Sequence, residues 1–262
     1  MELSLVNKRA LVCGASQGIG LATAIELAGL GADITLFARN EERLEQALTA
    51  LPGSDQQGHS YLVADFDDPD QVFRAVQEAH GKGSRWDIVI NNSGGPPGGT
   101  IVSAAREEFL TAFNRHLLSS HSILQVVLPG MKEASFGRIV NIISTSVKQP
   151  LKGLGVSNTI RGAVANWAKT LATEVAEFGI TVNNVLPGAT STARLAGLLK
   201  SRAESGGEPE EFYAAQMMSQ IPAGRFARPD EVAAAVAFLC TPAAAYINGI
   251  NVPVDGGRTG SL

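Results

Sequence analysis

The stretch RALVCGASQGIG, residues 9–20, predicts a short apolar strand that passes through a glycine-rich turn into a helix. Glycine tolerates positive φ angles and a close backbone approach, and the first turn of a helix offers unpaired N–H groups with a partial positive charge. The turn from Gly14 to Gly20 therefore suits the diphosphate of a dinucleotide. A plain tight turn between strand and helix is the alternative, and the strand-turn-helix context favours the dinucleotide.

Short runs rich in valine and isoleucine alternate with longer helical patterns along the chain. The expected strands cover 9–13, 33–38, 61–64, 88–91, 138–143, 181–186 and 250–254, and the expected helices cover 19–29, 41–51, 71–80, 162–178 and 229–239, with a further long helix ending near Met131. Parallel neighbours need right-handed crossovers, which helices supply. The alternation predicts an α/β fold, with one doubly wound parallel sheet of about seven strands, helices on both faces and a single domain over 1–262.

One segment breaks this alternation. Residues 195–219 follow the expected end of a strand and include the polar stretch SRAESGGEPEEF, residues 201–212. Segments inserted at the carboxyl end of a strand often cover a binding site. We expect a mobile helical lid over 195–219.

The composition indicates an ordered globular protein, with 45% hydrophobic and 18% charged residues. A net charge of −4 gives no electrostatic reason for binding nucleic acid or an anionic membrane. Cys13 and Cys240 are far apart in the sequence and suggest neither a disulfide framework nor a metal site. The amino terminus lacks an apolar signal core, and no apolar stretch reaches about 18 residues. We expect a cytoplasmic protein without metal, membrane or nucleic-acid partners.

The residue about 20 positions beyond the glycine turn indicates which dinucleotide binds. An acid there grips the ribose of NAD, whereas a basic residue accommodates the 2′-phosphate of NADP. This chain has Phe37-Ala38-Arg39-Asn40, with no acid and with Arg39 as a bidentate phosphate partner. NADP(H) is therefore favoured and NAD(H) is possible. The alternative is that Arg39 only caps a surface turn.

Several motifs, in the right order, resemble those of the short-chain dehydrogenase/reductase family, and the resemblance covers nearly the whole chain. The glycine turn is similar to the family's TGxxxGxG, with Cys13 in place of threonine. Asn91-Asn92-Ser93-Gly94 is similar to its NNAG motif, with Ser93 in place of alanine. Further resemblances are Pro187-Gly188 followed by Thr192, and the carboxyl-terminal Val254-Asp255-Gly256-Gly257. The segment Arg228–Ala233 looks like a helix start found in the 3-oxoacyl-acyl-carrier-protein reductase branch of the family.

The resemblance implies a Rossmann-type fold and a set of cofactor-binding residues. These are Gly14, Ser16, Gln17, Gly18, Ile19 and Gly20 in the turn, Arg39, Asp65 and Phe66 near the adenosine, and Asn92, Ser93, Gly94, Arg161, Pro187, Gly188 and Thr192 toward the nicotinamide. Other roles stay open for some of them. Asp65 could close a strand, and Asn91 and Asn92 could bond to backbone in a turn.

Of the family's four catalytic residues, a tyrosine, a lysine, a serine and an asparagine, only the serine is present. Ser144 takes its position after a predicted strand. The family spacing places Ser157 where the tyrosine stands and Arg161 where the lysine stands. Counting back from Leu128-Pro129-Gly130-Met131 places His116 where the asparagine stands. The resemblance thus implies an oxidoreductase with an atypical set of catalytic residues.

These replacements change the chemistry. A serine hydroxyl such as that of Ser157 is a far weaker acid than a phenol with a pKa of about 10. Arg161 can bind but cannot release a proton near neutrality. If its ring faces Ser144, His116 could protonate an alkoxide, because imidazole titrates near neutrality. The alternative is a surface or subunit-contact histidine, and Tyr213 in the expected lid is an outside candidate for the missing phenol.

Two functions follow from this pattern. The first is an NADP(H)-dependent oxidoreductase that transfers a hydride to or from a carbonyl, alcohol or acyl thioester, similar to the 3-oxoacyl reductases. The second is a catalytically silent protein of the same fold that binds a dinucleotide as a ligand or sensor. The lost tyrosine favours the second, while Ser144 and His116 favour the first. The resemblance also implies a homodimer or homotetramer.

Overall fold

The computed structural model describes residues 1–53 and 57–261, which form one seven-stranded parallel sheet in the order β3-β2-β1-β4-β5-β6-β7. The strands are β1 (Arg9–Cys13), β2 (Asp33–Ala38), β3 (Ser60–Val63), β4 (Ile88–Asn91), β5 (Gly137–Ile142), β6 (Ile180–Pro187) and β7 (Asn251–Val254). The chain starts in the middle of the sheet, winds outward to β3 and returns to wind outward again to β7. The predicted α/β fold is confirmed.

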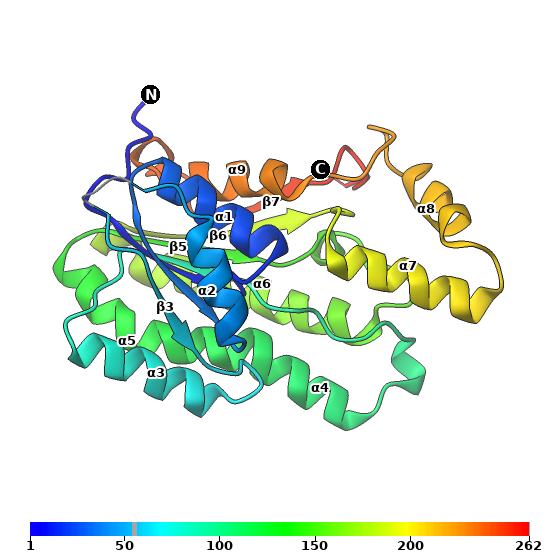
Figure 1. Cartoon of the computed structure of the whole chain (residues 1–262), viewed down its shortest axis with the longest axis horizontal. Coiled ribbons are helices and arrows are strands. Elements are labelled where there is room, and N and C mark those ends of the chain that lie inside the picture. The colour runs from blue at the N-terminus through cyan, green and yellow to red at the C-terminus, as the bar shows by residue number, and fades with distance from the viewer. Residues whose placement is uncertain (54–56, 262) are drawn as a thin grey trace.

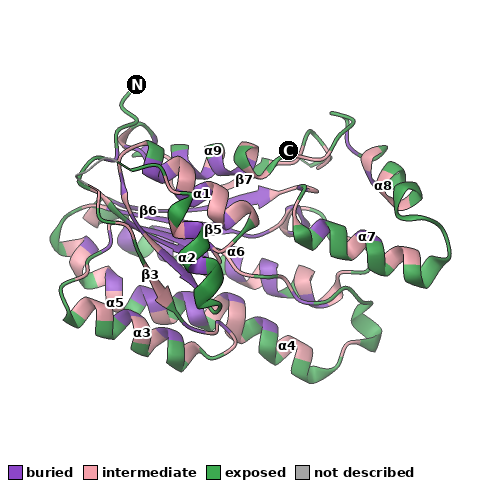
Figure 2. Cartoon of the chain, viewed as in Figure 1, coloured by how far each residue is buried: buried purple, intermediate pink, exposed green. Residues whose placement is uncertain are grey.

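Helices cover both faces of the sheet (Figure 1). One face carries α1 (Gly18–Gly29), α2 (Glu41–Thr49) and α9 (Pro229–Cys240), and the other carries α3 (Pro69–Gly81), α5 (Ser119–Glu133) and α6 (Gly155–Val175). Side chains alternate between the faces, so Ala10 and Val12 of β1 pack in one cluster and Leu11 and Cys13 in the other. Figure 2 shows the strands buried between the two helical layers.

Two helices differ from the sequence prediction. The helix expected over 162–178 begins at Gly155, because Val156 and Ile160 in its first turns bury themselves against α4 (Arg106–Phe113). The long helix expected to end near Met131 is α4 and α5 joined by a π-helical turn over Asn114–Leu118. A π turn carries one extra residue per turn and is common at functional sites.

A ladder of four asparagines crosses the second half of the sheet. The side-chain amide of Asn91 donates to Asn141 Oδ1, that of Asn141 to Asn184 Oδ1 and that of Asn184 to Asn251 Oδ1, each at 2.8 Å. These four residues pair in register across β4, β5, β6 and β7. The ladder satisfies polar groups that burial between two helical layers would otherwise leave costly.

The segment predicted as a lid forms α7 (Ala193–Gly206) and α8 (Glu210–Met218), which extend from one end of the molecule (Figure 1). Leu195, Leu199 and Met217 bury themselves in a small cluster of their own, against which Tyr213 packs. This cluster is separate from the two main cores, as a lid requires, and the mobility of the segment stays a prediction. Within the described ranges, no helix is long and apolar enough to cross a membrane.

Candidate active site

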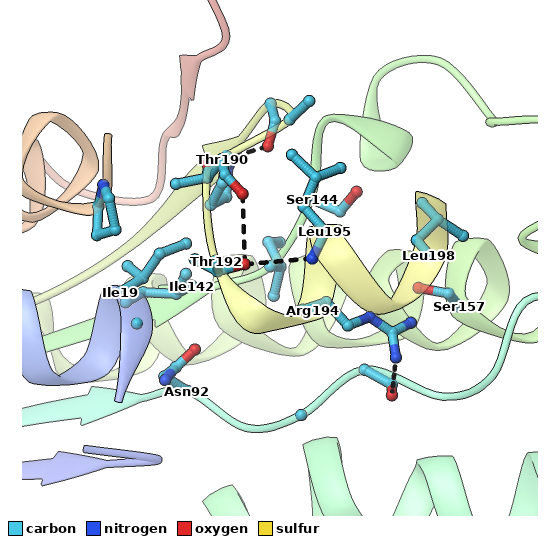
Figure 3. Close-up of a pocket in the computed structure, with 18 of the residues that line it drawn as sticks. Ile19, Asn92, Ile142, Ser144, Ser157, Thr190, Thr192, Arg194, Leu195 and Leu198 are labelled. Carbon is cyan, nitrogen blue, oxygen red and sulfur yellow. Dashed lines mark hydrogen bonds between the residues drawn. The ribbon is translucent and has the colours of Figure 1, made fainter. Parts of the chain in front are cut away.

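A cleft of about 550 Å³ opens at the carboxyl ends of β1, β4, β5 and β6 and extends under α7 (Figure 3). Ligands of open α/β sheets bind at this edge, where the winding direction changes. The predicted site residues that line the cleft are Gly14, Gln17, Gly18, Ile19, Asn92, Ser93, Gly94, Ser144, Ser157, Arg161, Pro187, Gly188 and Thr192. The cleft lining does not include Ser16, Gly20, Arg39, Asp65, Phe66 or His116.

The glycine turn fits a diphosphate. Gly14 and Gly18 have φ angles of +59° and +60°, which favour glycine. A Cβ atom at Gly20 would collide with the carbonyl oxygen of Gly14. The residue before α1, Gln17, makes no side-chain cap, so the first N–H groups of the helix are free to bind an anion.

Asn92 holds this turn in place. Its Nδ2 donates to the carbonyl oxygens of Cys13 and Gly14, both at 3.3 Å. The sequence analysis left open that the Asn92 side chain bonds to backbone. It does, but the backbone belongs to the glycine turn and not to a local turn around Asn92. On the opposite side, Thr192 caps α7 by accepting from Leu195 N at 3.4 Å, and its Cγ2 lies 3.4 Å from where a Cβ of Gly18 would be.

Arg39 and Asp65 lie next to each other outside the cleft, after β2 and β3. Arg39 Nη1 is 3.8 Å from Asp65 Oδ2, and the two side chains are 71% and 44% exposed. An exposed pair at this distance is weak, so the Arg39 guanidinium stays available to a phosphate. Phe66 is different, because its ring packs on Phe37 in the core with a centroid separation of 5.0 Å. Its ring therefore packs in the core, and a contact of Phe66 with the cofactor stays a prediction.

Ser144 and Ser157 both line the cleft, from the end of β5 and from α6. Ser144 Oγ accepts from the backbone N–H of Ser146 at 3.1 Å. Because a hydroxyl has one proton and two lone pairs, this contact leaves the Ser144 proton free to donate to a substrate oxygen.

Arg161 lies one helical turn beyond Ser157 and is 8% exposed. Its Nη1 donates to the carbonyl oxygen of Ile142 at 3.1 Å, which directs the guanidinium under the cleft. Burial, and then the nearby charge of Arg194, lower the pKa of Arg161 to about 10. It is still a cation at neutral pH.

His116 lies in the π turn and is 4% exposed, so the alternative of a surface or subunit-contact histidine is wrong. Its Nδ1 shares a 2.6 Å hydrogen bond with Ser93 Oγ. The condition for proton transfer to an alkoxide, a ring that faces Ser144 in the cleft, is not met, because His116 lines a second, smaller cavity behind Ser93 and not the cleft. Burial, and then the charges of Arg161, Arg115 and Arg194, hold the pKa of His116 well below 6.5.

Three buried polar atoms lack a hydrogen-bond partner among the described residues that surround this second cavity: Asn91 Oδ1, His116 Nε2 and Arg161 Nε. The cavity holds about 10 Å³, which is about the room that one water molecule needs. Residues of the asparagine ladder, of the π turn and of α6 line this cavity together.

Sequence reasoning missed Arg194. Its guanidinium donates from α7 to the carbonyl oxygens of Gly95, at 2.9 Å, and of Pro96. These bonds tie the lid segment to the Gly94–Gly99 loop, and Arg194 lines the cleft near Ser157 (Figure 3). The signal in the sequence was an arginine two positions after Thr192. Tyr213, the outside candidate for a phenol, packs inside the lid cluster and does not line the cleft.

A glycine turn opening a helix at the switch point of a doubly wound sheet defines the class of Rossmann-type proteins. The family model described as Enoyl-(Acyl carrier protein) reductase matches residues 14–259. The 3-oxoacyl-(acyl-carrier-protein) reductase FabG from Pseudomonas aeruginosa is 33% identical over 257 residues, which cover 97% of this chain and 98% of that protein. The chain belongs to the short-chain dehydrogenase/reductase family, in the branch of the 3-oxoacyl reductases.

Other relatives have different substrates. The cyclohexanol dehydrogenase from Rhodococcus sp. (strain TK6) is 33% identical over 275 residues, which cover 98% of each chain. The crystal structure of L-sorbose reductase from Gluconobacter frateurii, complexed with NADPH and L-sorbose, is similar with a TM-score of 0.92 and 31% identity over 100% of both chains. The family therefore limits the reaction class more than it limits the substrate.

Proposed function

We propose that this protein is an NADP(H)-dependent oxidoreductase that interconverts a carbonyl and an alcohol. The observation that carries the proposal is one cleft with the glycine turn at one end and Ser144 and Arg161 at the other. Arg39, with no acid in its place and only a weak partner, supports NADP(H) over NAD(H). The relative from Gluconobacter frateurii was solved with NADPH, which agrees with this choice.

NADPH, when bound, supplies the hydride. Ser144 donates its free proton in a hydrogen bond to the substrate carbonyl and orients it. The positive charge of Arg161, in the same cleft, favours the negative charge that develops on this oxygen at longer range and without a direct contact, because burial strengthens electrostatic interactions. Ser157 is too weak an acid to act as the phenol does, and we assign Arg161 the role of a fixed cation, so the alkoxide, a strong base, takes its final proton from solvent through the open cleft.

His116 acts through Ser93 in this proposal. With its pKa well below 6.5, it is neutral at pH 7 and is a poor proton donor. Its hydrogen bond fixes Ser93 at the edge of the cleft, next to Asn92 and the glycine turn. We therefore place His116 as a positioning residue.

A silent dinucleotide-binding protein is the second candidate. One observation favours it: among the described residues that line the cleft there is no tyrosine. Oxidation of NADPH, followed over a panel of ketones and oxoacyl thioesters, separates the two candidates. Turnover supports the oxidoreductase, and saturable NADPH binding with no turnover on any compound supports the silent protein.

The Ser144→Ala variant tests the site assignment. We expect turnover to fall by about 10² or more with NADPH affinity unchanged, the scale for one polarising hydrogen-bond donor. Ser201→Ala, an exposed serine on α7 outside the cleft, is the matched control and should keep full turnover. The cytoplasmic location, the homo-oligomer and the closing lid stay predictions.

A further inference from the structure

All charged side chains that line the large cleft, among the described residues, are positive. Arg161, Arg194 and Arg258 line it, and among the described residues of its lining there is no aspartate or glutamate. Arg258 has a side-chain acceptor of its own, because its Nη2 donates to Gln220 Oε1 at 2.9 Å. That acceptor is neutral, so all three arginines lack a carboxylate partner among the described residues, and Arg161 and Arg194 are the two whose guanidinium groups approach each other.

The two guanidinium groups converge at Gly95. Arg194 Nη2 lies 3.3 Å, and Arg161 Nη2 3.7 Å, from the point that a Cβ atom at Gly95 would occupy. Arg161 arrives from α6 and Arg194 from α7, so the fold brings together two like charges that the sequence keeps 33 positions apart. Like charges this close repel, and the burial of Arg161 increases the repulsion, while Arg194 is exposed.

The neighbouring Arg115, unlike Arg161 and Arg194, has a carboxylate that compensates its charge. Arg115 donates through Nε and Nη2 to both carboxylate oxygens of Asp67. Arg161 and Arg194, by contrast, donate to backbone carbonyl oxygens, which carry no net charge. Arg161 is a buried cation without a counter-charge, which is costly, and Arg194 adds a second, exposed cation beside it, so an anion between the two groups would offset the charge of both.

We propose that Arg161 and Arg194 form a subsite for a carboxylate of the substrate, which is then a 2-oxo or 3-oxo acid or the corresponding hydroxy acid. A planar carboxylate matches the fork of donors that a guanidinium presents. Gly95 leaves room for it, since a side chain there would fill the space between the two groups. Leu151, Leu198 and Met217 line the same cleft and suit a short apolar body.

The reaction assigned to a substrate bound at this subsite rests on the proposed oxidoreductase function, whereas anion binding at the subsite does not. Because Ser144 and Arg161 line one cleft, a substrate whose carboxylate is held at Arg161 can present its oxo group to Ser144. The oxo carbon takes a hydride from NADPH, its oxygen takes a proton from solvent water, and the products are the hydroxy acid and NADP⁺. The carboxylate is unchanged by the reaction.

Binding tests the subsite without any turnover. Malonate and its uncharged analogue malonamide are titrated by calorimetry into the protein with saturating NADP⁺, which occupies the glycine turn. We expect malonate to bind at least about tenfold more tightly than malonamide, the scale for charged hydrogen bonds. Arg194→Met should weaken malonate by a similar factor, and Arg202→Met, on the same helix but outside the cleft, should not. Gly95→Ala should also weaken malonate, with both charges retained.

Kinetics separate this subsite from a merely structural role of Arg194. With 3-oxobutanoate and its methyl ester as paired substrates, we expect Arg194→Met to raise KM for the acid and to leave KM for the ester nearly unchanged. If malonate binding depends on Arg194 while no oxo acid is reduced, the proposed oxidoreductase fails and the subsite stands. Equal binding of malonate and malonamide, no saturable malonate binding, or equal losses for acid and ester in Arg194→Met would overturn the subsite.

Discussion

Ser93 Oγ and His116 Nδ1 share a hydrogen bond of 2.6 Å across the wall between the cleft and the smaller cavity behind it. In the sequence these two residues are separate departures from the family pattern, one in the motif after β4 and one in the π turn. The structure joins them, since each supplies the polar partner that the other needs when buried. A histidine at this place is thus accounted for by its partner and requires no proton transfer.

The buried His116 gives the first prediction, a loss of stability in mild acid. The pKa of His116 is depressed in the folded protein, by burial and by the charges of Arg161, Arg115 and Arg194, so below about pH 6.5 the unfolded state binds a proton that the folded state does not. The free energy of unfolding should fall by up to about 1.4 kcal/mol per pH unit below that value. Denaturant unfolding between pH 7.5 and 5 measures it.

His116→Asn is the control for this pH effect, because it removes the titrating group and keeps every other histidine. The difference between the two proteins should widen in favour of the variant as the pH falls. Parallel pH profiles for wild type and variant would show that His116 does not carry the effect.

Local sequence patterns predict much of the fold, but they do not predict which side chains meet in the candidate site. The strands are short, mainly apolar runs between polar or glycine-containing segments, and β1, β2 and β4 match the prediction to the residue. The start of α6 was missed because the polar, glycine-rich residues before Gly162 have weak helix propensity, and burial of Val156 and Ile160 overrides it. Arg194 bonds to carbonyl groups 98 and 99 positions away, which no local pattern specifies.

Gly20→Ala should damage the phosphate turn. The added methyl group would collide with the carbonyl oxygen of Gly14 and lie 2.8 Å from Asn92 Nδ2, so the turn and its asparagine must shift. We expect about 1–3 kcal/mol of lost stability, as for overpacked sites, and NADPH affinity weakened at least about tenfold. Gly29→Ala, in the same helix with nothing within 4 Å, is the matched control and should be neutral or slightly stabilising. Tight NADPH binding by Gly20→Ala would contradict the role of this turn.

Arg39→Leu should reduce the preference for NADPH over NADH. Arg39 is the cation after β2, so its loss removes a charge-assisted contact with the 2′-phosphate and leaves contacts shared by both cofactors. We expect affinity for NADPH to fall about tenfold or more while that for NADH stays nearly constant. Arg74→Leu matches it, because Arg74 is similarly exposed and has a similarly weak partner, Asp68 at 4.0 Å. Equal losses for the two cofactors in Arg39→Leu would remove the 2′-phosphate role.

The asparagine ladder predicts a graded loss of stability from its middle to its end. Asn141→Leu leaves Asn91 Nδ2 without an acceptor and Asn184 Oδ1 without a donor, both buried, so we expect a loss of about 2 kcal/mol or more. Asn251→Leu frees only Asn184 Nδ2 at the less buried end and should cost less. Asn166→Leu, exposed on α6, should stay within about 0.5 kcal/mol of wild type. Denaturant midpoints at one pH give the order, and equal losses for Asn141→Leu and Asn251→Leu would mean that the ladder does not act as a connected network.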